Sequence, residues 1–408
     1  MDSDRNLTVV EEVELMALLF LHGMALASWF VPLGRVLDAA GVGSIKPMAF
    51  AASAIAAILS PLFFGAMADR SVAPPKVLRW ISFATAALVG LIAWAIQGKA
   101  DSWAILLLIQ VQALFCSPTS SLAGSIVFSQ LIRSKRQFGS IRALGTVGWM
   151  VGCWLISLLA LDASPRAFYV SSILWMMLGA FTWRLPSEML NRLSAQPLTL
   201  RERFGWDALS LLRNNDHCVV FITAALIAIP FAAFYPFTPP HLAELGLERT
   251  SAWMSLGQVT EVIALVSMGA MLRRWRFKWV VATGIGVGVF RYALYATNST
   301  FFVLLGLSLH GIAFTFTYIG SQIYLAERIE PGWRTRAQAL LSLMTGGLGS
   351  LTGYLWCGAW LGMCTSDGSV HWSLYWGGLS LLVVGVLIYF TTRYHGSHSI
   401  LEVRQSQE

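Results

Sequence analysis

Long apolar segments recur along nearly the whole chain, and they constrain its fold more than any other feature of the sequence. A helix needs about 20 mostly apolar residues to cross the hydrocarbon core of a bilayer. Hydrophobic residues make up 56% of the chain and charged residues only 12%, whereas a soluble protein carries about twice that charged fraction. The sequence therefore predicts an all-α protein that lies in a lipid bilayer.

These segments predict twelve transmembrane helices. We place them near residues 14–36, 46–67, 76–97, 103–131, 138–160, 166–185, 216–241, 251–272, 277–297, 300–326, 336–362 and 372–393. The seventh contains several prolines, so its outer half is expected to be kinked or broken.

The longest polar connection, Pro186–Asn215, divides the predicted spans into six and six. We therefore expect an N-terminal six-helix bundle (1–185), a cytoplasmic linker (186–215), and a C-terminal six-helix bundle with a short cytoplasmic tail (216–408). Within the linker, Leu198–Leu212 is predicted to form an amphipathic helix on the inner membrane surface.

The distribution of lysine and arginine predicts the orientation of the chain. With both termini cytoplasmic, the five cytoplasmic connections hold 18 lysines and arginines, and the six outer connections hold five. This asymmetry follows the positive-inside rule. The basic residues behind the net charge of +7 are therefore explained by the orientation of the chain in the membrane and do not indicate a nucleic-acid partner. We expect a multi-pass protein of the cell (inner) membrane. The five cysteines lack paired spacing and suggest neither a disulfide framework nor a metal site.

Two near-copies lie 204 residues apart in this chain of 408. Gly65–Arg70 has the sequence GAMADR and Gly269–Arg274 has GAMLRR, and each follows a long apolar run. Gly139–Gly148 and Thr335–Met344 form a second, weaker pair at a similar offset. Repeats of this kind predict two pseudo-symmetric bundles related by an axis along the membrane normal, and two-bundle membrane proteins are usually transporters.

The first copy carries Gly65-x-x-x-Asp69-Arg70 between the second and third predicted spans. This motif at this place, its degenerate partner and the six-plus-six layout resemble the major facilitator superfamily. The resemblance implies that Gly65, Asp69 and Arg70 form a cytoplasmic conformational latch, which ties the two bundles together at a helix end. Asp69 lies at a membrane–water boundary beside basic residues, where a charge-assisted hydrogen bond forms readily.

Ionisable side chains within the spans identify candidate functional residues, because each costs roughly 2.5–3.5 kcal/mol to insert. Four positions stand out: Arg142, Glu261, Arg291 and His310. Arg291 lies nearer the outer end of its span, so its side chain is expected to reach outward and to have a structural role.

Arg142 shares one helix face with Thr146 and Trp149, which follow at i+4 and i+7. A cation, a hydroxyl and a ring aligned in this way suit a polar ligand that carries a ring. The alternative is an arginine that extends to the inner surface, which its shallow depth allows.

Glu261 lies about 15 Å into its span, near the middle of the membrane, and Gln258 precedes it on the same face. A buried carboxyl without a permanent partner can bind and release a proton near neutral pH. Glu261 is therefore the candidate proton-coupling group. The alternative is a structural ion pair with Arg142.

His310 lies at a similar depth, with Phe314 on its helix face and Tyr318 adjacent. A histidine can hydrogen-bond a ligand or share a proton at physiological pH. The aromatic residues Trp29, Trp149, Phe234, Tyr235 and Phe314 can flank a planar ligand. The alternatives are a neutral core histidine and aromatic residues that serve only packing.

Several segments resemble the nucleoside:proton symporter family. They are Ile141–Gly148, Ser255–Glu261, Phe290–Leu294, Gly311–Phe314, Ala326–Glu327 and Arg336–Gln338. The resemblance implies import of a nucleoside together with a proton. It also implies substrate contacts at Arg142, Thr146, Trp149, Gln258, Glu261 and Phe314.

The chain departs from that family's pattern in two spans. In the seventh span, Ala232 and Tyr235 stand where family members carry a polar amide pair. In the tenth, Thr315 replaces an aspartate and His310 replaces a tyrosine. These departures leave Glu261 as the main candidate for the coupling proton.

The sequence thus predicts a monomeric secondary active transporter, without a cofactor, that imports nucleosides with protons by alternating access. The expected substrate-binding residues are Arg142, Thr146, Trp149, Tyr235, Gln258, Glu261, His310, Phe314 and Tyr318. The alternative is a major facilitator carrier of another small substrate, such as an aromatic acid, a sugar or a drug, with Arg142 as counter-ion to an anion. The chain has no His-x-x-x-His or Gly-x-Ser-x-Gly pattern, so we expect no enzyme, no catalytic residues and no metal site.

Overall fold

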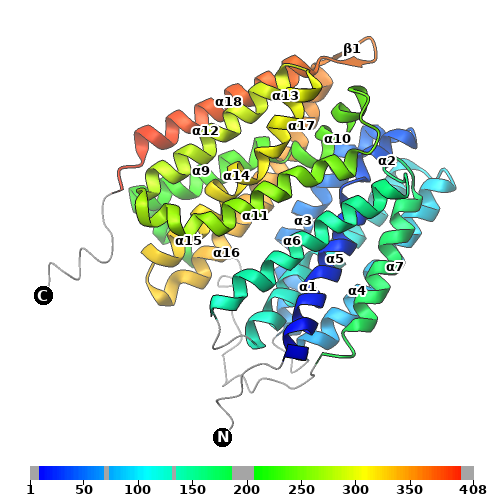
Figure 1. Cartoon of the computed structure of the whole chain (residues 1–408), viewed down its shortest axis with the longest axis horizontal. Coiled ribbons are helices and arrows are strands. Elements are labelled where there is room, and N and C mark those ends of the chain that lie inside the picture. The colour runs from blue at the N-terminus through cyan, green and yellow to red at the C-terminus, as the bar shows by residue number, and fades with distance from the viewer. Residues whose placement is uncertain (1–8, 69–72, 131–134, 186–205, 397–408) are drawn as a thin grey trace, which may run out of the picture. The chain divides into compact units, whose positions relative to one another are not determined.

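The computed structural model describes residues 9–68, 73–130, 135–185 and 206–396 (Figure 1). Within these ranges, the side chains at 9, 61–68, 128–130 and 135–142 are not described. The predicted latch of Gly65, Asp69 and Arg70 therefore lies outside the described residues, as does the side chain of Arg142.

The chain divides into two compact units. Unit 1 holds Met1–Pro197 and Leu247–Ser255, and unit 2 holds Leu198–Gly246 and Leu256–Glu408.

Unit 1 is built from helices that follow one another along the chain. They are α1 (Val9–Phe30), α2 (Leu33–Ala39), the 3₁₀ turn η1 (Gly43–Ile45), α3 (Lys46–Ala68), α4 (Pro74–Gln97), α5 (Ser102–Gln130), α6 (Lys135–Leu158) and α7 (Arg166–Phe181). Helix α1 packs along α6 and α7, α4 packs against α5 and α7, and α3 packs against α5.

Glycine permits the close crossing of α1 and α6. A side chain at Gly23 would collide with the carbonyl oxygen of Gly145, and a side chain at Gly148 would collide with that of Phe20. Small residues let helices approach closely in membranes. This crossing fixes the part of α6 that carries Thr146 and Trp149.

The first turn of α11 (Thr250–Arg274) is counted with unit 1. There, the Asp162 carboxylate accepts hydrogen bonds from the Ser251 N–H (2.7 Å) and the Ser157 hydroxyl (2.9 Å). The Ala252 N–H donates to the Ser157 hydroxyl (2.9 Å). Such contacts satisfy N–H groups that a helix start leaves without an intrahelical partner. They fix where α11 begins, and α11 continues into unit 2 with Gln258 and Glu261.

Unit 2 contains more interruptions in its helices than the described part of unit 1. Its elements are η2 (Trp206–Arg213), α9 (Asn215–Phe231), α10 (Phe234–Glu244), the rest of α11, α12 (Phe277–Ala296), α13 (Thr300–Ser308), α14 (His310–Phe314), η3 (Thr315–Ile319), α15 (Gly320–Arg328), η4 (Pro331–Trp333), α16 (Arg334–Ser342), η5 (Leu343–Gly349), α17 (Ser350–Met363), the strands β1 (Thr365–Ser366) and β2 (Ser369–Val370), and α18 (Trp372–Arg393). Helices α12 and α18 lie side by side, and α9 packs against α17 and α18 (Figure 1).

One of these interruptions has a local cause in the sequence. The predicted break in the seventh span is confirmed. Helix α9 ends at Phe231, one residue after Pro230, and α10 begins at Phe234. Two further interruptions, η3 and η5, are π-helical turns. Such turns are rare and are frequently found at functional sites.

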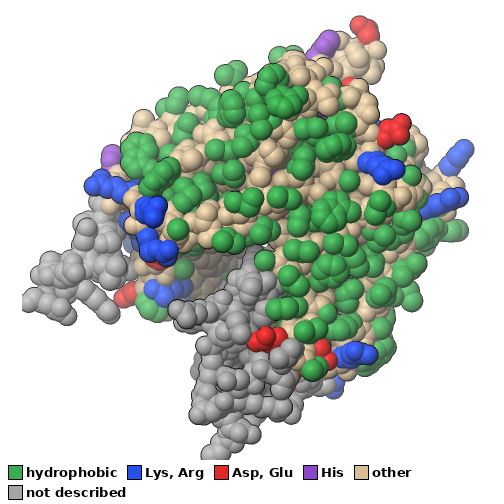
Figure 2. Space-filling view, in the orientation of Figure 1, with side chains coloured by type: hydrophobic (Ala, Val, Ile, Leu, Met, Phe, Trp, Pro, Cys, Tyr) green, Lys and Arg blue, Asp and Glu red, His purple; other side chains and the backbone are tan. Residues whose placement is uncertain are grey.

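Within the described residues, nine helical segments are long and apolar enough to cross a membrane, and two shorter apolar helices cover Ala143–Leu158 and Arg166–Phe181. Large hydrophobic side chains lie on the surface, where they can face lipid, and Figure 2 shows them over much of the visible face. Examples on α4 and α18 are Trp80, Trp94 and Leu381. Of the predicted amphipathic helix Leu198–Leu212, residues 206–212 are described, and they lie within a 3₁₀ helix, Trp206–Arg213.

Candidate functional site

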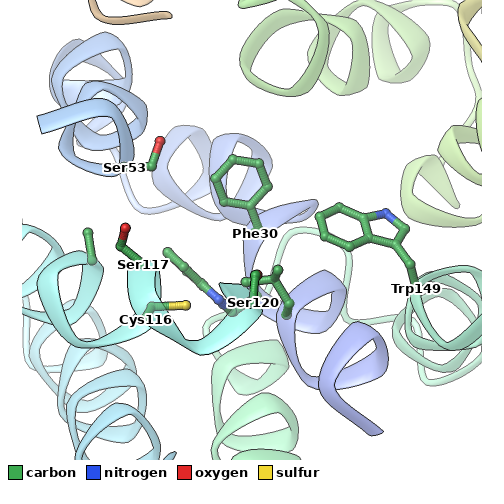
Figure 3. Close-up of a pocket in the computed structure, with 9 residues that line it drawn as sticks. Phe30, Ser53, Cys116, Ser117, Ser120 and Trp149 are labelled. Carbon is green, nitrogen blue, oxygen red and sulfur yellow. The ribbon is translucent and has the colours of Figure 1, made fainter. Parts of the chain in front are cut away.

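Unit 1 contains a cavity of about 200 Å³ with one aromatic and one hydroxyl-bearing side. It is lined by Leu26, Trp29 and Phe30 of α1, Ser53 of α3, Ala113, Cys116, Ser117 and Ser120 of α5, and Trp149 of α6. Ser53 and Ser117 lie on the other side of the cavity from Trp149, with Phe30 between them (Figure 3). None of these nine residues carries a charge, so the cavity suits an uncharged ring with polar substituents.

Trp149 is the predicted site residue that lines this cavity. Its ring lies 6.3 Å from that of Phe30, edge to face, and Phe30 packs in the same way on Trp29 (5.7 Å) and Phe50 (5.2 Å). Thr146, one turn earlier on α6, is half-buried. The aromatic end of the predicted Arg142–Thr146–Trp149 stripe is therefore at a cavity.

Sequence reasoning missed the α5 side of the cavity. Cys116, Ser117 and Ser120 follow one another around Pro118, which lies inside α5. Small polar residues beside an intrahelical proline are a weak indication, because a proline inside a helix also frees a backbone carbonyl that such residues can satisfy.

Unit 2 contains a column of four stacked rings, Phe234, His310, Phe314 and Tyr318, which we call the aromatic column. The His310 ring lies 3.6 Å from that of Phe234 at an interplanar angle of 6°. Phe314 stacks on His310 (6.1 Å) and on Tyr318 (5.1 Å). Phe234 and His310 are buried, whereas Phe314 and Tyr318 are half-buried. The structure thus brings together three predicted site residues that lie four residues apart on one helical run.

A second pair of predicted residues is in contact beside Phe234. The Gln258 amide Nε2 donates to the Tyr235 hydroxyl at 3.4 Å, and the Tyr235 ring packs edge to face on Phe234 (4.9 Å). The Gln258 Oε1 atom is buried and accepts no hydrogen bond in the described part of the chain. A buried acceptor without a hydrogen bond lowers stability by about 1–3 kcal/mol through lost hydration. A ligand that donates a hydrogen bond to Gln258 Oε1 would offset this cost.

Glu261 lies where α11 crosses α14. A side chain at Gly311 would collide with the Glu261 backbone and the Gly257 carbonyl, so the two helices are in close contact at the residue that follows His310. The Glu261 side chain is half-buried. Gln258, Glu261 and His310 therefore belong to one region of unit 2.

The expectation that Arg291 reaches outward is wrong. Its side chain is fully buried and donates hydrogen bonds to His310 and to the Tyr292 hydroxyl. Its guanidinium carbon lies 4.3 Å from the ring centre of Tyr292, 5.0 Å from that of Phe231 and 5.3 Å from that of Phe234. Ring faces and hydrogen-bond acceptors here take the place of water, so the cation is stabilised without reaching the surface.

The contact between Arg291 and His310 was a further omission of the sequence reasoning. The two residues lie on consecutive helical runs, α12 and α13–α14, joined by a short connection, and such runs are usually neighbours in space. Two ionisable residues on neighbouring spans are a signal that could have found the pair.

Comparison with known proteins decides the family. The family model described as Nucleoside H+ symporter matches residues 10–398. The chain belongs to the nucleoside H+ symporter family. A similar relative is the putative nucleoside transporter YegT of Escherichia coli (strain K12), which is 32% identical over 356 residues, covering 84% of this chain and 82% of the relative. The xanthosine permease of the same organism is 25% identical over 411 residues, covering 94% and 96%.

Solved structures show the same fold. The crystal structure of the nucleoside transporter NupG superposes with a TM-score of 0.84 at 23% identity, covering 94% of this chain and 98% of that chain. The POT family transporter PepTSo gives a TM-score of 0.70 at 12% identity, covering 99% and 100%. This symporter-family chain is thus an all-helical membrane transporter with the major facilitator fold, and it is not an enzyme.

Proposed function

We propose that this protein imports nucleosides together with protons by alternating access. The observation that carries the proposal is the aromatic column of unit 2, which lies beside the Gln258–Tyr235 pair and the α11 segment that bears Glu261. Rings for stacking, a buried amide and a carboxyl are the groups needed to bind a planar base and polar hydroxyls and to carry a proton. The relatives named as a putative nucleoside transporter and a xanthosine permease support the same cargo.

The unit 1 cavity supports an uncharged, ring-bearing cargo. Drug-sized ligands occupy pockets of about 300–1,000 Å³, so a cavity of about 200 Å³ suits one ring of a substrate. We propose that Trp149 and Phe30 stack on that ring, with Thr146 and Arg142 further along α6 as additional contacts. An aromatic acid would find no counter-charge among the nine residues that line the cavity.

Unit 2 supplies the polar contacts in this proposal. Gln258 Oε1 accepts a hydrogen bond from the substrate, and Tyr235, Phe314 and Tyr318 contact its ring or its hydroxyls. Gln258 is 4% exposed, so this hydrogen bond forms away from bulk water and selects strongly for a donor.

Glu261 couples transport to the proton. Protonation removes the cost of a buried charge and lets the loaded carrier change conformation. A proton that enters down a potential of 100 mV supplies about 2.3 kcal/mol, which concentrates a neutral substrate about 50-fold.

We further propose twelve spans in two pseudo-symmetric bundles, 1–185 and 216–408, joined by the linker 186–215. Helices α6 and α7 and the run from α16 to α17 add three spans to the nine long apolar segments of the described residues. The proposal includes a monomer in the cell (inner) membrane, cytoplasmic termini and a latch of Gly65, Asp69 and Arg70.

Uptake of radiolabelled uridine into proteoliposomes tests the function, with and without an inward proton gradient. We expect gradient-driven accumulation that unlabelled uridine or adenosine suppresses, and that phenylpropionate or a lactoside does not. Competition by phenylpropionate or the lactoside alone would identify a different cargo.

The Arg142→Ala variant is expected to insert normally into the membrane and to lose substrate binding.

A further inference from the structure

Arg291 stands in a series of hydrogen bonds whose direction is determined at every step. A guanidinium has only donors. Its Nη1 group contacts His310 Nδ1, and its Nη2 group donates to the Tyr292 hydroxyl at 2.6 Å. The Tyr292 hydroxyl therefore uses its own hydrogen for the Pro230 carbonyl, at 2.5 Å. His310 Nδ1 must accept, so the ring hydrogen lies on Nε2.

Packing holds the His310 ring in this position. Phe234 covers one face at 3.6 Å, and the guanidinium occupies the Nδ1 edge. The guanidinium is itself buried against the rings of Phe231, Phe234 and Tyr292. Stacking on Phe234 and the hydrogen bond from Arg291 at Nδ1 therefore hold the ring in one orientation.

The opposite edge of the ring faces α11. A Cβ atom at Gly257 would lie 3.3 Å from His310 Cδ2, the ring atom next to Nε2. Within the described part of the chain, Nε2 has no hydrogen-bond partner. Ionisable residues on the elements packed here include Glu261 on α11, Tyr235 on α10, and Tyr292 and Tyr295 on α12.

We propose that Arg291 is a positioning residue that keeps His310 neutral and presents its Nε2–H to the substrate as a hydrogen-bond donor. This inference rests on the proposed function. The Nε2–H donor selects substrates whose ring carries a neutral acceptor. Nucleobases carry such acceptors as carbonyl oxygens and unprotonated ring nitrogens. A second proton on His310 would put an N–H at Nδ1 against a guanidinium N–H and bring two cations together. The coupling proton is therefore carried by another group.

Nuclear magnetic resonance of the histidine ring tests the tautomer directly. The protein is labelled with ¹³C,¹⁵N-histidine and embedded in lipid bilayers, and the His310 signals are those that disappear in His310→Phe. We expect an unprotonated Nδ1 and an N–H at Nε2, unchanged between about pH 5 and 8. An N–H at Nδ1, or a ring that gains a second proton within that range, would overturn the inference.

Variants at the two positions test the positioning role. Arg291→Met removes the donor at similar length, and we expect a signal from an Nδ1–H tautomer to appear beside the original one. His310→Phe keeps the stacking surface but lacks the donor, so uridine binding should weaken about 2- to 10-fold. His310→Gln can accept from Arg291 and donate to the substrate, and should recover most of that loss. Equal binding by the wild type and His310→Phe, or no recovery with His310→Gln, contradicts the proposal.

The two proposals fail in different ways. If the wild-type protein binds no nucleoside, the proposed function is wrong, and the tautomer of His310 is still decided by its ring signals. If uridine binds and the His310 ring titrates, the inference is wrong and the function stands. Should Arg291→Met not fold, the wild-type spectrum and the two His310 variants decide the question.

Discussion

The two units carry candidate sites with different chemistry. In unit 1, rings and serine hydroxyls surround a cavity whose nine lining residues have no charge. In unit 2, the aromatic column, which includes the imidazole of His310, is accompanied by the carboxyl-bearing Glu261 and the buried cation of Arg291. A neutral cavity can recognise a ring by stacking and shape, whereas titratable groups in a dry environment can respond to a proton.

The backbones of the two units also differ, in the continuity of their helices. In the described part of unit 1, α1 and α6 are continuous helices that cross at glycines. In unit 2, helices are interrupted after Phe231 and at the π turns Thr315–Ile319 and Leu343–Gly349. In the described residues, the helix breaks are thus concentrated in unit 2.

Replacing Glu261 by glutamine tests whether unit 2 alone holds the coupling group, and it has the largest expected effect. Gradient-driven accumulation of uridine, about 50-fold at 100 mV, should fall to simple equilibration, because the amide cannot carry a proton. Exchange of internal for external uridine should persist. Glu330→Gln, at an exposed position of the same unit, is the control. Proton-driven accumulation that survives in Glu261→Gln would show that Glu261 of unit 2 is not the coupling group.

Valine substitutions at the helix crossings test how much close helix contacts contribute to the stability of each unit. Gly148→Val forces a side chain into the Phe20 backbone, and Gly311→Val does the same at the Glu261 backbone. We expect each to lower the free energy of unfolding by about 1–3 kcal/mol, measured as a fall in thermal stability in detergent. Gly124→Val, which meets open space on α5, should have little effect. An unaffected Gly148→Val would show that α1 and α6 do not depend on this contact.

Trp149 tests the neutral cavity by itself. Trp149→Ala should weaken uridine binding about 5-fold or more, since stacking of a base on an aromatic ring contributes about 1–3 kcal/mol. Trp149→Phe should retain most of the affinity. Trp94→Ala, on the exposed face of α4, is the matched control. Equal binding by Trp149→Ala and the wild type would place ring recognition in unit 2 alone.

The smallest expected effects concern the Gln258–Tyr235 pair. Gln258→Leu removes the buried acceptor and should weaken uridine binding about 2- to 10-fold. Tyr235→Phe leaves Gln258 Oε1 in place and should weaken it less. Binding isotherms on both variants measure the difference. A larger loss for Tyr235→Phe would mean that the hydroxyl, and not the amide, contacts the substrate.

Much of the fold was predictable from local patterns. Apolar runs long enough to cross a membrane predicted helices, and the prolines after residue 229 predicted the break between α9 and α10. Helix periodicity also placed Phe314 on the face of His310, with Tyr318 adjacent, because a helix brings i and i+4 together whatever surrounds it. The π turn within this run was not predicted, since it depends on packing rather than on composition.

The sequence by itself determined the membrane environment, the repeat and the family, because hydropathy, charge distribution and motifs are properties of residues in order. Only the tertiary structure decided what each buried polar group contacts. Arg291 was expected to extend toward water by its depth, yet its surroundings offer rings and acceptors from three helices. Likewise, the cavity at Trp149 is formed by α1, α3, α5 and α6 together. A buried side chain takes the partner that is nearest in space, and that partner is set by how helices pack, which no single segment encodes.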